Sequence, residues 1–285
     1  MTLNVTVASR SLSVQTSDFR LTRGDTGAIV SSSAQKQVVL HYTGWSGLLC
    51  YTGLASWGSH DTAKWLGRIL EHLPGQRSMR DVVERVRDEG NIWLKTVPAE
   101  HRWHTFTLMA YEGPVPHLYA ISSFQSLQGA DLAAPREYFF ISHARVRGIK
   151  HFVTGQSMHV EDDEVRNLKD EVARRRDPVI IREAAAELNR RVANKAGDVV
   201  SESCIASHML PDGSGEAQVF GDLNDKFIPS MIIKGMNVAP YAPKALREAG
   251  ESSRARLVGV TWAKNGGSAA MIMALRPLDK HSQNK

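Results

Sequence analysis

Residues 2–21 read TLNVTVASRSLSVQTSDFRL, and this stretch decides the fold. Apolar and polar residues alternate within 2–9 and again within 11–21, as they do in half-buried strands. A tight turn near Arg10 is expected to join the two strands. The start of the chain is therefore predicted to be an antiparallel β-hairpin.

The register of this hairpin decides which side chains meet. Matching Val5 with Val14 and Val7 with Leu12 favours a register that puts Asp18 on the face opposite Thr2. A β-bulge, or burial of both faces between layers, would still bring the two residues together.

Beyond the hairpin, groups of strands alternate with pairs of helices. Apolar residues at helical spacing predict four helices, and alternating or short apolar runs predict strands. This order favours an α/β (α+β) protein, a four-layer αββα sandwich in which helices flank two antiparallel sheets. Helices are expected at 60–73, 78–94, 161–176 and 179–195, and strands at 36–42, 48–52, 105–111, 117–123, 137–146 and 203–210.

Several helix starts carry sequence signals. Ser59 is available to cap the first helix, and Ser78 with Asp81 forms a capping box for the second. Asp177 followed by Pro178 is typical of a cap and first helical residue, and predicts the start of the fourth helix.

The last quarter of the chain is expected to be a C-terminal extension, residues 213–285, on a main domain of residues 2–212. It holds two strand candidates, 256–262 and 269–275. The polar tail DKHSQNK is expected to be disordered.

Composition narrows the possible partners. No apolar run approaches the roughly 20 residues that span a membrane, and the N-terminal stretch lacks the features of a signal peptide. A cytoplasmic protein without a membrane partner is expected. The net charge is +5, but the basic residues are scattered apart from 174–176 and 190–191, which lie among acidic residues. No nucleic-acid partner is therefore expected.

Metal and cofactor sites are not predicted either. His101 and His104 have a spacing compatible with metal binding, but they precede a strand and have no evident carboxylate partner. Cys50 and Cys204 lie in apolar runs, which predicts buried free thiols.

Thr2 becomes the first residue if Met1 is removed, and its small side chain permits that removal. A free α-amino group has a pKa of about 8, so that one residue then supplies both a hydroxyl nucleophile and a base. The hairpin brings Asp18 toward Thr2. Lys36, at the start of the next strand, is a candidate cation that lowers the pKa of the Thr2 hydroxyl.

These residues resemble a known family. The run from Thr2 through Ser17-Asp18-Phe19-Arg20, with Lys36 before an apolar strand, resembles the opening of proteasome β-type subunits and their bacterial relatives, the N-terminal-nucleophile (Ntn) hydrolases. The resemblance implies that Thr2 is the nucleophile, that Lys36 is the catalytic lysine and that Asp18 holds Lys36 in place.

Further positions carry the resemblance. Gly53, within YTGLA, resembles the glycine whose amide forms the oxyanion hole, and Asp198 and Ser201, within DVVS, resemble the pair that steadies the terminal amine. A further supporting position falls on Gln156 or Ser157, and the alignment leaves both open.

The resemblance implies a threonine peptidase that acts on peptides or unfolded proteins, forms a homo-oligomeric ring and needs no cofactor. Two alternatives stay open: an inactive scaffold or assembly subunit of the same fold, and an amidohydrolase acting on small amides. Simpler roles also exist, because Lys36 can be a solvated strand-edge residue, and Asp198 and Ser201 can cap a turn.

Overall fold

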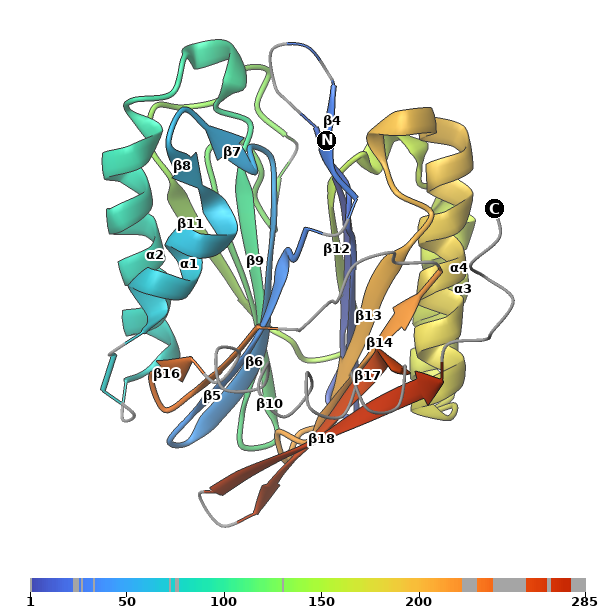
Figure 1. The fold of residues 1–285 in the computed structure, drawn as a ribbon. Coiled ribbons are helices and arrows are strands. Elements are labelled where there is room, and N and C mark those ends of the chain that lie inside the picture. Colours follow the sequence, from blue (N-terminus) through green and yellow to red (C-terminus); the bar gives the residue numbers. More distant parts are fainter. Residues whose placement is uncertain are drawn as a thin grey trace.

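The computed structural model describes residues 2–22, 26, 28–32, 34–71, 73–74, 77–129, 131–221, 230–237, 255–265 and 268–277. These residues form two seven-stranded sheets, two small two-stranded sheets and four α-helices (Figure 1). The prediction of a mixed α+β protein is confirmed. No helix within the described ranges is long and apolar enough to cross a membrane.

The first large sheet contains the predicted hairpin. Its strand order is β12-β1-β2-β13-β14-β17-β18. All neighbouring strands in it run antiparallel. The strands are β1 (Leu3–Ala8), β2 (Ser13–Asp18), β12 (Lys150–Gly155), β13 (Cys204–Met209), β14 (Gly215–Phe220), β17 (Ala255–Asn265) and β18 (Ser268–Pro277).

The hairpin register differs from the expected one. Val7, rather than Val5, lies opposite Val14. The cause is a four-residue loop at positions 9–12, closed by Ser9 Oγ, which donates to the Leu12 carbonyl at 2.7 Å and accepts from the Leu12 amide at 3.2 Å. No bulge interrupts the pairing of β1 with β2, and every residue of both strands is buried. Of the two arrangements that could bring Thr2 and Asp18 together, the hairpin therefore shows burial of both faces and not a bulge.

The second large sheet has the order β11-β10-β9-β6-β5-β15-β16. Its β15 runs parallel to β5, so the expectation of wholly antiparallel sheets is corrected. A parallel partner became possible because β15 comes from the C-terminal part of the chain and not from a hairpin with β5. The strands are β5 (Gln37–Tyr42), β6 (Trp45–Thr52), β9 (Thr105–Glu112), β10 (Val115–Ser122), β11 (Phe140–Arg145), β15 (Ser230–Ile233) and β16 (Met236–Asn237). The small sheets pair β3 (Leu21–Thr22) with β4 (Ile29–Ser31) and β7 (Ser56–Trp57) with β8 (His60–Asp61).

The helices pack in pairs on the two large sheets (Figure 1). α1 (Thr62–Leu70) and α2 (Met79–Leu94) bury apolar side chains against the second sheet, and α3 (Asp162–Ala173) and α4 (Pro178–Ala196) do so against β1 and β2. The predicted starts of α2 and α4 are confirmed by the capping box at Ser78 and by the bond from the Val179 amide to Asp177. Asp61, not Ser59, caps α1, because the short strand β8 carries the chain into the helix two residues later.

A third apolar cluster joins the two sheets. Leu48 and Met109 of the second sheet contact Ile205 and Met209 of the first, and all four are buried. Burial of such side chains contributes about 1.5–3 kcal/mol each. This cluster therefore holds the two sheets together.

Strands from beyond residue 213 continue both large sheets. β14, β17 and β18 extend the first, and β15 and β16 extend the second. Trp262 of β17 is buried and donates its indole N–H to the Gly213 carbonyl at 3.1 Å. The expected strands at 256–262 and 269–275 lie within β17 and β18. The expected disordered tail lies outside the described residues.

Candidate active site

Thr2, Asp18 and Lys36 meet in one buried cluster. Lys36 Nζ donates to Thr2 Oγ1 at 2.7 Å and to Asp18 Oδ1 at 3.0 Å, and it also donates to the Arg20 carbonyl. Thr2 is 3% exposed, and the side chains of Lys36 and Asp18 are fully buried. Thr2 precedes β1, so its side chain is not bound to the alternation of the strand, and it reaches Lys36 without a bulge.

Backbone amides donate the other hydrogen bonds that the Asp18 carboxylate accepts. Oδ1 also accepts from the Leu3 amide at 3.1 Å, and Oδ2 accepts from the amides of Arg20 at 2.9 Å and Ser201 at 3.2 Å. With the Lys36 ammonium, the carboxylate therefore has four hydrogen-bond donors. A buried charge remains charged only with such partners, so this arrangement fixes the Asp18–Lys36 ion pair beside Thr2.

Burial changes the acid–base behaviour of Lys36. Desolvation lowers the pKa of Lys36, the charge and hydrogen bond of Asp18 oppose that shift, and Arg20 adds to it. A cation in contact with the hydroxyl stabilises the negative charge that develops on Oγ1 when its proton is removed. The cluster can therefore activate Thr2 Oγ1 as a nucleophile.

The predicted pair Asp198 and Ser201 separates in the structure. The Asp198 side chain is 94% exposed, and its Oδ1 accepts from Arg20 Nη1 at 3.3 Å. Ser201 is buried, and its contact with the cluster is through its amide to Asp18. Its hydroxyl accepts from the Ser203 amide at 3.2 Å. Ser201 thus joins the cluster through its backbone, and Asp198 touches it only through Arg20.

β12, a strand that the sequence did not predict, holds the backbone of Thr2. The Gln156 amide donates to the Thr2 carbonyl at 2.9 Å, and Gly155 pairs with Leu3. A Cβ on Gly155 would lie 1.7 Å from the Thr2 carbonyl oxygen, and its φ is +87°. Only glycine fits this close approach. Of the two open positions, Gln156 thus contacts Thr2 through its backbone, and Ser157 lines the cavity described below.

Gly53 follows β6 at the edge of the same site. Its φ is +103°, and a Cβ there would lie 2.3 Å from the Trp103 carbonyl oxygen and 2.8 Å from His104 Nδ1. The glycine is therefore required by both conformation and space. His104 is fully buried beneath it, and burial lowers the pKa of His104 to about 3. Within the described ranges, no group of three or more His, Cys, Asp or Glu side chains is placed to hold a metal ion.

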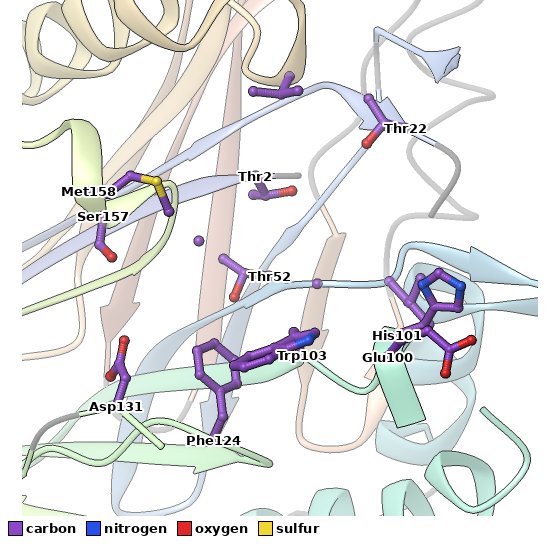
Figure 2. Close-up of a pocket in the computed structure, with 14 residues that line it drawn as sticks. Thr2, Thr22, Thr52, Glu100, His101, Trp103, Phe124, Asp131, Ser157 and Met158 are labelled. Carbon is purple, nitrogen blue, oxygen red and sulfur yellow. The ribbon is translucent and has the colours of Figure 1, made fainter. Parts of the chain in front are cut away.

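A cavity of about 580 Å³ opens at Thr2 (Figure 2). Its wall combines the hydroxyl of the candidate nucleophile with two aromatic rings and with carboxylates. Sequence reasoning missed most of this wall, because Trp103, Phe124 and Asp131 lie in segments outside helices and strands, which carry no periodic pattern. The lining residues include Thr2, Gly53, Trp103, Phe124, Asp131 and Met158.

No protein-family model and no curated protein matches the chain. Solved structures of Anbu proteins do. An Anbu (Gly-1) mutant from Hyphomicrobium sp. strain MC1 is 15% identical with a TM-score of 0.48, covering 88% of this chain and 97% of that chain. Anbu (ancestral beta-subunit) from Yersinia bercovieri is also 15% identical with a TM-score of 0.48, covering 72% and 81%.

The assignment drawn from the sequence is corrected by this outcome. No family model places the chain among proteasome β-type subunits or Ntn hydrolases, and the two structures above are described as Anbu proteins. At 15% identity the likeness gives no residue of this chain a role.

Proposed function

We propose that this protein is a hydrolase of amide bonds, a threonine-type peptidase, that uses Thr2 as its nucleophile after Met1 is removed. The supporting observation is the 2.7 Å contact between Lys36 Nζ and Thr2 Oγ1 within a buried ion pair. Stability alone does not explain a buried Asp18–Lys36 ion pair, because well-packed apolar side chains would stabilise the fold as well or better.

The reaction follows from these groups. The free α-amine of Thr2 takes the proton from Oγ1, which attacks the substrate carbonyl while Lys36 stabilises the developing charge. The Gly53 amide, at the cavity wall, donates to the oxyanion of the tetrahedral intermediate. The amine returns the proton to the leaving nitrogen, the C–N bond breaks, and an ester on Thr2 remains. Water then hydrolyses that ester, with the amine again serving as base.

The supporting residues have smaller parts in this proposal. Ser201 positions Asp18 through its amide. Asp198 acts on Lys36 only through Arg20, whose carbonyl accepts from Lys36 and whose guanidinium binds Asp198. Ser157, in the cavity wall, contacts the substrate.

The wider expectations belong to the same proposal. We assign the fold to a four-layer αββα sandwich, with residues 2–212 as the main domain and 213–285 as its extension. A peptide or unfolded-protein substrate, a homo-oligomeric ring and a cytoplasmic location stay predictions. The mass of the native assembly tests the ring.

Two measurements test the chemistry. Intact mass shows whether Met1 is removed, and a chain that keeps Met1 rules the mechanism out. Hydrolysis is then compared on fluorogenic peptides and on small amides, which separates a peptidase from an amidohydrolase. Thr2→Ala is expected to lower the rate by about 10³-fold or more. Thr2→Ser keeps the hydroxyl and is expected to retain activity.

A matched control is available in the same cavity. Thr22 also lines it, on another strand. An electrophile that reacts with an adjacent amine and hydroxyl is expected to label wild type and Thr22→Ala but not Thr2→Ala. Activity that survives in Thr2→Ala would overturn the proposal, because the nucleophile would then be another residue.

A further inference from the structure

The charged side chains of the cavity beside Thr2 have one sign. Glu100 and Asp131 line it, and its described wall contains no lysine and no arginine. Lys36 is buried next to Thr2 and is neutralised by Asp18 at 3.0 Å. A ligand in the cavity therefore meets a negative field, which favours a cation over a neutral or acidic group.

An aromatic surface forms the floor of the cavity. The rings of Trp103 and Phe124 pack edge to face, with centroids 5.1 Å apart and an interplanar angle of 72°. Trp103 is 39% exposed and Met158 is 76% exposed, so apolar area is left uncovered. Figure 2 shows both rings below Thr2 and Thr52. Such a surface suits an alkyl stem, and an indole face also attracts a cation.

Asp131 is held by a buried partner. Its Oδ2 accepts from Gln125 Nε2 at 3.0 Å, and Gln125 Oε1 in turn accepts from Thr105 Oγ1 at 3.2 Å. Gln125 is 3% exposed and Thr105 is fully buried. The carboxylate is thereby fixed at the cavity although Asp131 itself is exposed. A fixed carboxylate loses little conformational freedom when it binds a cation.

The two acids occupy different sides of the floor. In Figure 2, Asp131 lies on the side of Ser157 and Met158, and its carboxylate points toward Ser157. Glu100 lies on the other side, next to His101, with its carboxylate turned away from Trp103. Asp131 is therefore the acid that faces a ligand lying on the aromatic rings.

We propose that this cavity selects substrates with a lysine or arginine side chain next to the scissile bond. The alkyl stem lies on Trp103 and Phe124, and the charged end binds Asp131. Asp131 is thus a specificity-determining residue. This inference rests on the proposed function for its substrate, but the binding it describes does not require that Thr2 be reactive.

The test uses peptide pairs that differ only in charge: lysine against norleucine, and arginine against citrulline, on either side of the scissile bond. For wild type, kcat/KM is expected to favour the cationic member on the order of tenfold, the ratio that one good charged contact produces. Asp131→Asn is expected to reduce this preference to below about threefold, within the range of an exposed ion pair lost. Glu100→Gln, the matched control, is expected to keep the preference.

A second measurement separates the inference from the proposed chemistry. The same peptides are titrated into Thr2→Ala by calorimetry, where no turnover is possible. Asp131-dependent preference in binding, without hydrolysis by wild type, would sink the proposed function and leave this inference standing. Hydrolysis by wild type without a cation preference, or an equal loss of preference in Glu100→Gln, would overturn the inference and leave the function standing. Absence of both binding and hydrolysis would overturn both.

Discussion

Two ion pairs near Thr2 differ sharply in their surroundings. Asp18 and Lys36 are fully buried and 3.0 Å apart, whereas Asp198 is 94% exposed and lies 3.3 Å from Arg20, whose side chain is 18% exposed. The sequence suggested a catalytic part for an acid in each pair. Only the buried pair contacts the Thr2 hydroxyl.

The difference shows where electrostatic effects are strong. Water screens the exposed pair, and such pairs contribute about 0–1 kcal/mol. The buried pair has lost its water, so each charge depends on its partner and on the amides around Asp18. The four predictions below test that contrast, starting with the largest effect.

Removal of the buried cation is expected to have the largest effect. Lys36→Met keeps the stem but leaves the Asp18 carboxylate without its counter-ion. Breaking one half of a buried pair costs about 3–5 kcal/mol. Urea unfolding measures the loss, and labelling of Thr2 by the electrophile is expected to disappear with it.

A double variant checks that the cause is the unpaired charge. Asp18→Asn combined with Lys36→Met removes both charges, and it is expected to be more stable than Lys36→Met alone. If the double variant is the less stable one, lost packing rather than an unpaired carboxylate explains the effect.

His104 extends the contrast to a buried group without a charged partner. Burial holds its pKa at about 3 in the folded protein, and both ring nitrogens lack hydrogen-bond partners among the described residues. Unfolded histidine has a pKa near 6.5, so the unfolded chain binds the proton first as the pH falls. Stability is therefore full above about pH 6.5 and is lost by about 2 kcal/mol between pH 7 and pH 5.

The measurement is the urea midpoint at pH 7, 6 and 5 for wild type and for His104→Phe, which keeps an aromatic ring beside Phe106. The variant is expected to show a smaller fall. His208, whose pKa burial also lowers to about 4, contributes in both proteins and cancels in the comparison. Equal slopes in the two proteins would contradict the assignment to His104.

The buried cluster also depends on the backbone around Thr2. Gly155→Ala puts a methyl group against the Thr2 carbonyl at a φ of +87°. Gly44→Ala is its matched control, because Gly44 has a φ of +88° but open space around it. Both variants carry the conformational strain, so the difference between them isolates the contact with Thr2.

We expect Gly155→Ala to be less stable than Gly44→Ala by about 1–3 kcal/mol, as for other overpacked sites. It is also expected to slow labelling of Thr2, which Gly44→Ala leaves unchanged. Thermal unfolding and the labelling rate measure the two effects. Identical labelling in both variants would show that β12 does not position Thr2.

Much of the fold could be predicted because its signals are local. The hairpin of β1 and β2 follows from alternation, and the capping residues Ser78 and Asp177 mark helix starts. β12 was missed because Phe152 and Val153 are adjacent, so this edge strand shows no alternation. The parallel pairing of β15 with β5 was missed because it is a contact between distant parts of the chain.

In the candidate active site, too, some residues could be predicted from the sequence and others could not. Thr2, Asp18 and Lys36 were predicted to meet, and they do, since a buried strand pair leaves few places for their polar ends. The direction of Asp198 was not predictable, because a short pattern does not say whether a side chain points inward or to solvent. Trp103 and Asp131 reach the cavity from separate loops, and only the folded chain brings them together.

The smallest expected effect belongs to the exposed pair. Asp198→Asn removes a charge that is 94% exposed, so stability is expected to change by less than about 1 kcal/mol. The change should shrink further in high salt, because an exposed pair is screened. The turnover of Asp198→Asn is a stricter test of the contrast between the two pairs, since Asp198 reaches Lys36 only through Arg20. A loss of turnover comparable to that of Lys36→Met would show that Asp198 acts on the site directly, and exposure would then be a poor guide to which of the two pairs matters.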